Sequence, residues 1–258
     1  MQDAASGPDA LSRCLGAYDR VRAELSAGPV EFGSAEGCTG AIGPDGTPWL
    51  DERFYLPTGL AFGMPLPPDL ERAALSLLDE LLGRVGIGSQ AGEVGVVRVP
   101  TGCLHVTLLS KSHYTQTDGV LSFIEPEEVR RAAEALRDLP SRPVEIRFRG
   151  LLVCPEGRVM IPGYPSDDTL FRIREAIRRA LGERQYYTSR MAHMKLAHLV
   201  GHPAPEHVQA LRDAVTDLHE VDLGQYRFPI LRSTRAGDIP LTPPGEAAAG
   251  TDAEPAGE

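Results

Sequence analysis

The order of predicted elements repeats once along the chain, and this repetition limits the fold more than any other feature of the sequence. Residues 58–66 predict a short strand, residues 67–84 an amphipathic helix, residues 93–109 two strands separated at Pro100 and Gly102, and residues 125–139 a second helix. The same order of strand, helix, strand and helix then follows from residue 143 to residue 218. Strands that alternate with helices without regular βαβ units favour an α+β fold with antiparallel or mixed sheets.

The second half of this repeat has clear local signals. Apolar and polar residues alternate around Val144, Ile146 and Phe148, and the stretch CPEGR predicts a turn between two strands. The next helix is expected to be capped by Ser166 or Asp167. The strand 191–200, a further helix and a last strand at residues 226–233 complete the half.

The two ends of the chain differ from this central part. Apolar residues from Leu11 to Leu25, including Leu15, recur at three and four residue steps and predict an N-terminal helix, which a glycine-rich connection follows. The Pro, Gly, Ala and acidic composition from residue 240 onward predicts a disordered tail. We therefore expect an N-terminal segment at 1–50, one domain at 51–239 and an acidic tail at 240–258.

Two strands carry the same polar pattern. In CLHVTLLSK, the alternation of side chains puts His105 and Thr107 on one face, together with Leu109. In MAHMKLAHL, the same count puts His193 and Lys195 on one face and His198 on the other. A single histidine in a strand is usually structural, but two matching pairs at equivalent places in a repeat indicate one shared site. We expect both pairs to line a cleft between two similar lobes.

Two opposed imidazoles suit in-line displacement at phosphorus. One histidine can remove a proton from the attacking oxygen while the other protonates the leaving oxygen, because the ordinary pKa of about 6.5 makes both protonation states accessible. The second residue of each pair, Thr107 or Lys195, would bind the non-bridging phosphoryl oxygens. This scheme requires no metal and no cofactor.

The arrangement resembles the 2H phosphoesterase superfamily, which includes RNA 2′,3′-cyclic phosphodiesterases and 2′-5′ RNA ligases. The resemblance covers residues from about 56 to 235 and is carried by HVTL, which matches at His105 and Thr107, and by HMKL, which matches at His193. It implies a bilobal α+β fold with two pseudo-symmetric lobes around a central cleft. It also implies metal-independent hydrolysis of 2′,3′-cyclic phosphates, 2′-5′ linkages or other small nucleotides.

Lys195 departs from this pattern, because the family usually has Thr or Ser there. A lysine ammonium is a compact charge that binds phosphoryl oxygens, so the activity could be kept or directed to a more anionic substrate. Lysine is also longer and has no acceptor. A second hypothesis is therefore a protein that binds a small nucleotide or a phosphorylated ligand without turnover.

Other residues near the two strands are weaker candidates for lining the substrate. Aromatic and basic side chains can stack on a base or bind a phosphate. Residues 40–56 could cover the mouth of the cleft or extend the first sheet. The candidates are Tyr187, Arg190, Lys111 and Tyr114.

Composition excludes several other classes of protein. The formal net charge of −10 does not favour binding to long nucleic acid duplexes. The four cysteines have no CxxC spacing and indicate reduced thiols, and neither a GxSxG motif nor a phosphate-binding GxxxxGK loop is present in the sequence. Without an apolar segment of membrane length or a signal-like N-terminus, we expect a cytoplasmic monomer whose ligand is a small nucleotide or an RNA end.

Overall fold

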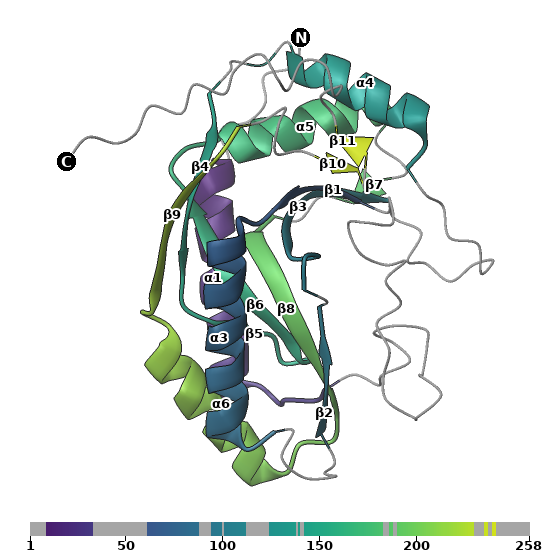
Figure 1. Cartoon of the computed structure of the whole chain (residues 1–258). Helices are drawn as coiled ribbons and strands as arrows, with labels where there is room; N and C mark the ends of the chain where they lie inside the picture. Colours follow the sequence, from purple (N-terminus) through teal and green to yellow (C-terminus); the bar gives the residue numbers. More distant parts are fainter. Residues whose placement is uncertain are drawn as a thin grey trace, which may run out of the picture.

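The computed structural model describes the central part of the chain in several segments. The described residues are 9–32, 61–87, 94–99, 101–111, 124–137, 139, 142–182, 186–187, 190–229, 235–236 and 239–240. Within them the chain is α+β, with helices packed against one antiparallel sheet (Figure 1). The predicted fold class is confirmed at this level.

The helices start and end close to the predicted positions. Asp9 caps the first helix, since its carboxylate accepts from the backbone N–H of Ser12 at 2.7 Å. The helix that begins at Thr169 has Asp168 at its N-cap, one residue after the two predicted caps, and the adjacent Asp167 accepts from the N–H of Thr169 at 2.9 Å. The helices are α1 (Ala10–Ala27), α3 (Pro68–Val85), α4 (Pro126–Arg137), α5 (Thr169–Leu181) and α6 (Pro205–Leu218).

The strands form one antiparallel sheet of eleven members. Its path runs β11-β10-β1-β3-β8-β6-β4-β9, while β2 pairs with β8, β5 with β6 and β7 with β3. The strands are β1 (Ala61–Pro65), β2 (Val94–Arg98), β3 (His105–Lys111), β4 (Val144–Arg149), β5 (Leu152–Val153), β6 (Arg158–Pro165), β7 (Tyr186–Tyr187), β8 (Ala192–Gly201), β9 (Asp222–Phe228), β10 (Arg235–Ala236) and β11 (Ile239–Pro240).

The connections on the two sides of the β3/β8 junction correspond to each other. On one side, β1 leads through α3 to β3 and pairs with it; on the other, β6 leads through α5 to β8 and pairs with it. The helices also contact each other across the junction. The first helix of each half packs against the second helix of the other half, so that α3 contacts α6 and α5 contacts α4. The internal repeat of the sequence is thus visible as a correspondence in connectivity, centred on the two strands that carry the histidines.

The predicted break before His105 has a geometric reason. Arg98 pairs with Ala197 of β8, and Val106 pairs with Met194 of the same strand. Seven residues therefore separate Arg98 from Val106, whereas two residues separate their partners on β8. The excess must leave the sheet, and Gly102 takes the left-handed conformation, with φ +82°, within that excursion.

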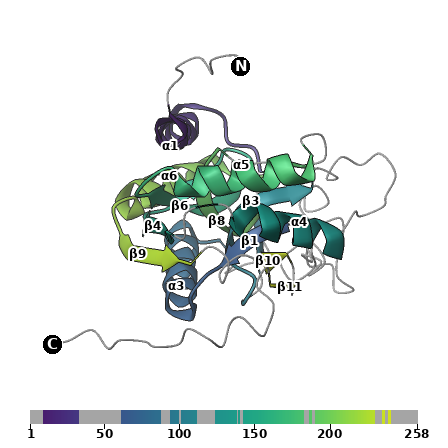
Figure 2. The same cartoon turned by 90° about the horizontal axis from the view of Figure 1, so that it is seen from above.

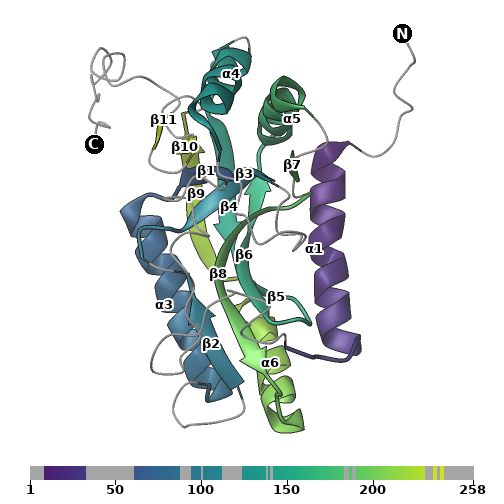
Figure 3. The same cartoon turned by 90° about the vertical axis from the view of Figure 1, so that its right-hand side faces the viewer.

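Helix α1 lies on the sheet face opposite α3, as two views agree (Figures 2 and 3). Its buried Tyr18 donates its hydroxyl hydrogen into the gap between the carbonyl oxygens of Gly163 on β6 and Ala192 on β8. Cys14 accepts from the N–H of Ala192 at 3.4 Å. Within the predicted apolar face of α1, Cys14, Tyr18 and Leu25 are buried, Leu11 and Val21 are partly buried, and Leu15 is 40% exposed.

The C-terminal part differs in detail from the prediction. β9 begins at Asp222, four residues before the predicted start, and pairs along β4 through an exposed polar face. Pro240, the first residue of the predicted tail, pairs with Arg235 in the last strand pair. Residues 241–258 and the predicted cleft cover at 40–56 lie outside the described residues. Among the described helices, none has the length and apolar character needed to span a membrane.

Candidate functional site

The two His-x-polar pairs lie side by side at the centre of the sheet. The register pairs Val106 of β3 with Met194 of β8, and both are fully buried. In an antiparallel pair this register sets Thr107 across from His193 and His105 across from Lys195, all on the opposite face from the buried pair. The structure therefore brings the four predicted residues together on one face, hereafter the histidine face.

The placement differs from the expected walls of a cleft in one respect. His105 and His193 come from neighbouring strands of one continuous sheet and are diagonal neighbours, roughly 7–8 Å apart at their backbones by the usual geometry of such pairs. Their separation is compatible with one phosphoryl group lying between the two rings.

The ring of His105 is oriented by its own strand. Its Nδ1 lies 2.8 Å from the carbonyl oxygen of Cys103. A carbonyl oxygen only accepts, so Nδ1 carries the hydrogen and the neutral ring presents an unprotonated Nε2. Burial lowers the pKa of His105, and the bond to Cys103 acts in the opposite direction. The imidazole is thus a neutral group with a lone pair on Nε2.

The environment of His193 is more strongly cationic. Burial lowers its pKa to about 3, with the charges of Arg174 and Arg158 acting in the same direction and the backbone of Met191 in the opposite one. The positive form of His105 also lowers it, which places the two rings within electrostatic reach. His193 is consequently neutral throughout the physiological pH range.

Arg174 of α5 connects the two motif strands. It is 3% exposed, and its Nη2 donates to the carbonyl oxygens of Thr107 at 2.6 Å and Met191 at 3.0 Å. Each bond is charge-assisted and so stronger than a bond between neutral groups. The sequence analysis did not identify Arg174 as a site residue. Its spacing from Leu170, Ile173 and Ile177 places it on the buried side of the helix, and a charged residue at such a position was an available signal.

A register shift in β8 changes the position of His198. Met160 of β6 pairs with Lys195, but Arg158 pairs with His198, so the bulge adds one residue to β8 between them. Since Met160 and Arg158 share a face of β6, Lys195 and His198 share a face of β8. The prediction that His198 lies on the opposite face is therefore wrong, because strand parity was counted through a bulge.

A second register shift affects β3. Phe62 pairs with Leu109 whereas Gly63 pairs with Thr107, so Leu109 leaves the histidine face and is fully buried. Its predicted place beside Thr107 is wrong for the same reason. By the same register Ser110, which pairs with Ala61, takes the place of Leu109 on the face of Thr107.

The ammonium of Lys195 is within electrostatic reach of His198 beside the bulge. Its charge lowers the pKa of His198, for which burial is the largest cause, while His198 Nε2 lies 2.8 Å from the carbonyl oxygen of Glu156. Arg158 adds to the same positive region. The second half of the site thus has a cationic group where the first half has the hydroxyl of Thr107.

The weaker candidates are placed only in part. Arg190 is exposed and lies two residues before β8. The backbones of Lys111 and Tyr187 lie in the β3–β7 ladder, but their side chains are outside the described part of the structure, as is all of Tyr114.

The described residues contain no group of three or more His, Cys, Asp or Glu side chains that could hold a metal ion. Cys14, Cys103 and Cys154 are buried thiols that form no disulfide within the described residues. Burial raises the pKa of the Cys154 thiol to about 11, which keeps it protonated and unreactive at neutral pH.

Comparison with known proteins gives a distant likeness. No family model and no curated protein matches the chain. A solved structure described as TT0787 of Thermus thermophilus is similar at 19% identity and a TM-score of 0.38, over 65% of this chain and 82% of that one.

Proposed function

We propose that the chain is a metal-independent phosphodiesterase of the 2H type, which acts on 2′,3′-cyclic phosphates or 2′-5′ linkages of small nucleotides or RNA ends. The observation that carries this proposal is the Val106–Met194 register, because it puts both His-x-polar pairs on one face of adjacent strands. The correspondence in connectivity around β3 and β8 supports two lobes related by a pseudo-two-fold axis.

The unequal surroundings of the two histidines assign their roles. Arg174 and Arg158 oppose a positive charge on His193, so His193 is unprotonated before the reaction and we assign it to accept the proton of the attacking oxygen, with the negative charge of the bound phosphodiester offsetting the two cations. Within the described part of the chain, no arginine is among the groups that shift the pKa of His105. The negative charge of a bound phosphodiester favours its protonated form, and His105 then protonates the leaving oxygen.

The other two residues bind the phosphoryl oxygens in this proposal. The Thr107 hydroxyl lies across from His193 and donates one hydrogen bond, while Lys195 supplies a full positive charge near the bulge. Both groups stabilise the charge that develops on the non-bridging oxygens. A lysine here favours substrates with more negative charge than a hydroxyl would select.

The direct test uses 2′,3′-cyclic nucleotides with EDTA present and follows the products by phosphorus NMR. We expect hydrolysis, and a loss of at least about 100-fold in kcat/KM for His105→Ala and for His193→Ala. His219→Ala is the matched control, because His219 is an exposed residue at the end of α6. Hydrolysis that persists in both site variants would contradict the proposal.

A second candidate function follows from Lys195 alone. If the ammonium occupies the place of a phosphoryl oxygen, the site binds a nucleotide without turnover. Binding of 2′,3′-cyclic nucleotides by the wild type, with no product at high protein concentration, would favour this function over the first.

A further inference from the structure

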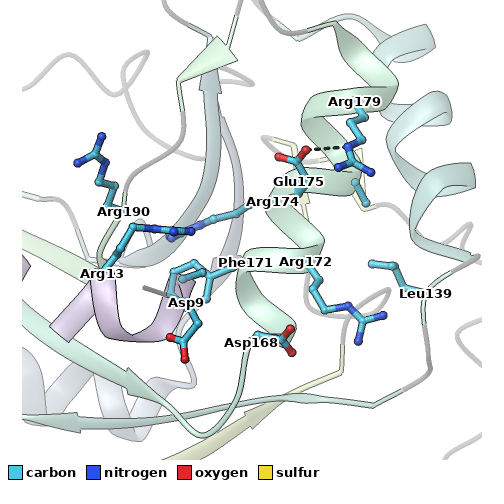
Figure 4. A pocket seen from close by; sticks show the side chains of 12 residues that line it. Asp9, Arg13, Leu139, Asp168, Phe171, Arg172, Arg174, Glu175, Arg179 and Arg190 are labelled. Carbon is cyan, nitrogen blue, oxygen red and sulfur yellow. Dashed lines mark hydrogen bonds and ion pairs between the residues drawn. The ribbon is translucent and has the colours of Figure 1, made fainter. Parts of the chain in front are cut away.

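An arginine-lined cavity lies beside the histidine face, between α1 and α5. Its volume is about 720 Å³, within the range of sites for small ligands. Arg13 comes from α1, Arg172, Arg174 and Arg179 come from α5, and Arg190 comes from the segment before β8. Figure 4 shows Arg13 and Arg174 reaching toward the same side of this cavity from two helices, with Arg190 beside them.

The cavity is positive although the chain is acidic. Five arginines and three carboxylates line it, which gives a formal charge of 5 − 3 = +2, against −10 for the whole chain. Two of the carboxylates are already engaged: Glu175 accepts from Arg178 and Arg179, and Asp9 accepts from Ser12. Arg174 is buried and Arg179 is bound to Glu175, whereas Arg13, Arg172 and Arg190 are exposed. These three give a concave site a positive charge that attracts anions.

The cavity also receives the N-terminal ends of two helices. Asp9 and Ala10 begin α1, and Asp168 precedes α5, so both helix starts contribute to the lining. The backbone dipoles of an 18-residue and a 13-residue helix therefore add to the positive potential of the arginines.

Arg174 joins this cavity to the reacting site. It lines the cavity, yet its Nη2 binds the carbonyl oxygens of Thr107 and Met191 on the two motif strands. Arg190 is three residues before His193, about 10 Å along an extended chain. Arg174 also opposes a positive charge on His193, so a residue that lines the cavity acts directly on the reacting site.

We propose that this cavity binds a second phosphate of the substrate, separate from the phosphodiester that reacts. The inference rests on the proposed function for the position of the reacting phosphate. It narrows the substrate class to nucleotides or RNA ends that carry at least one further phosphate. It also gives α1 a part in ligand recognition, through Arg13.

The test compares adenosine 2′,3′-cyclic phosphate with the same nucleotide bearing a 5′-phosphate, by calorimetry at fixed ionic strength. We expect the 5′-phosphate to tighten binding about tenfold in the wild type, as a charge-assisted contact would, and to lose this advantage in Arg13→Gln and Arg190→Gln. Arg20→Gln is the matched control, because Arg20 is exposed on the same helix and does not line the cavity.

Three results would overturn the inference: equal affinity of the wild type for both nucleotides, an advantage kept in both cavity variants, or an equal loss in Arg20→Gln. Parallel measurement of turnover separates the two proposals. A preference that depends on Arg13 and Arg190 without turnover supports the cavity and contradicts the phosphodiesterase. Turnover with equal affinity for the two nucleotides supports the phosphodiesterase and contradicts the second phosphate site.

Discussion

The two motif strands share a sequence pattern but have different surroundings. β3 holds His105 through a hydrogen bond to Cys103 of its own chain segment. β8 holds His193 among cationic groups, and α1 contacts both backbone groups of the preceding Ala192 through Tyr18 and Cys14. The difference shows that a duplicated motif can give two unequal histidines, because each acquires its pKa from neighbouring elements and not from the motif.

The largest effect is expected from removal of Arg174. Arg174→Met leaves the carbonyl oxygens of Thr107 and Met191 without these donors, and we expect a loss of about 2–4 kcal/mol in the free energy of unfolding. The pKa of His193 should rise, because a cation that opposes its protonation is gone. Urea denaturation and NMR titration of the histidines measure the two effects.

Arg172→Met is the control for this variant, since Arg172 is exposed on the same helix. We expect its stability to stay within about 0.5 kcal/mol of the wild type. If Arg174→Met changed neither the stability nor the titration of His193, Arg174 would not be a source of the electrostatic difference between the two strands.

The pH dependence of stability gives the next largest effect. The unfolded chain binds a proton at His193 below about pH 6.5, while the folded chain does so only near pH 3. Stability therefore falls as the pH falls through this window, by about 1.4 kcal/mol per pH unit for this one group. His193→Gln should remove that contribution.

Urea unfolding of the wild type, His193→Gln and His105→Gln between about pH 4 and 7 measures this dependence. The same carboxylates titrate in all three proteins, so the differences report the histidines. We expect the slope to flatten more in His193→Gln, because the pKa of His193 is lowered by arginines as well as by burial. Equal slopes in the two variants would show that the histidines are equivalent.

A smaller effect is expected where α1 contacts β8. Tyr18→Phe removes a buried hydroxyl that bonds to Gly163 and Ala192, at a cost of about 1–2 kcal/mol. Tyr164→Phe is the comparison, because the Tyr164 hydroxyl accepts from Arg22 at a partly buried position. If Tyr18→Phe is as stable as Tyr164→Phe, α1 does not hold the start of β8.

The smallest change in stability is expected from Lys195→Thr, within about 0.5 kcal/mol, because the side chain is partly exposed. Its effect should instead be on selectivity. Loss of the ammonium raises the pKa of His198 and weakens binding of the more anionic nucleotides several-fold relative to simple cyclic phosphates. Competition binding measures the ratio, and an unchanged ratio would show that Lys195 does not contact the ligand.

Much of the fold could be predicted from local patterns. The α+β class, the order of elements and the break before His105 follow from periodicity and turn residues, which are local in sequence. His198 and Leu109 were misplaced because a bulge depends on the partner strand, which a single sequence does not show. Arg174 was missed because its two acceptors are distant backbone carbonyls.

The junction between β3 and β8 has a mechanical consequence. In the described residues, one residue pair joins these strands, while six join β6 to β8 and five join β1 to β3. Each histidine therefore lies on a strand that is firmly paired on its outer side. The sheet bends most easily between β3 and β8, where the two histidines lie. The separation of the two rings is held by side chains that cross this line, such as Arg174, so force applied there would alter the geometry of the site before it unfolded either half.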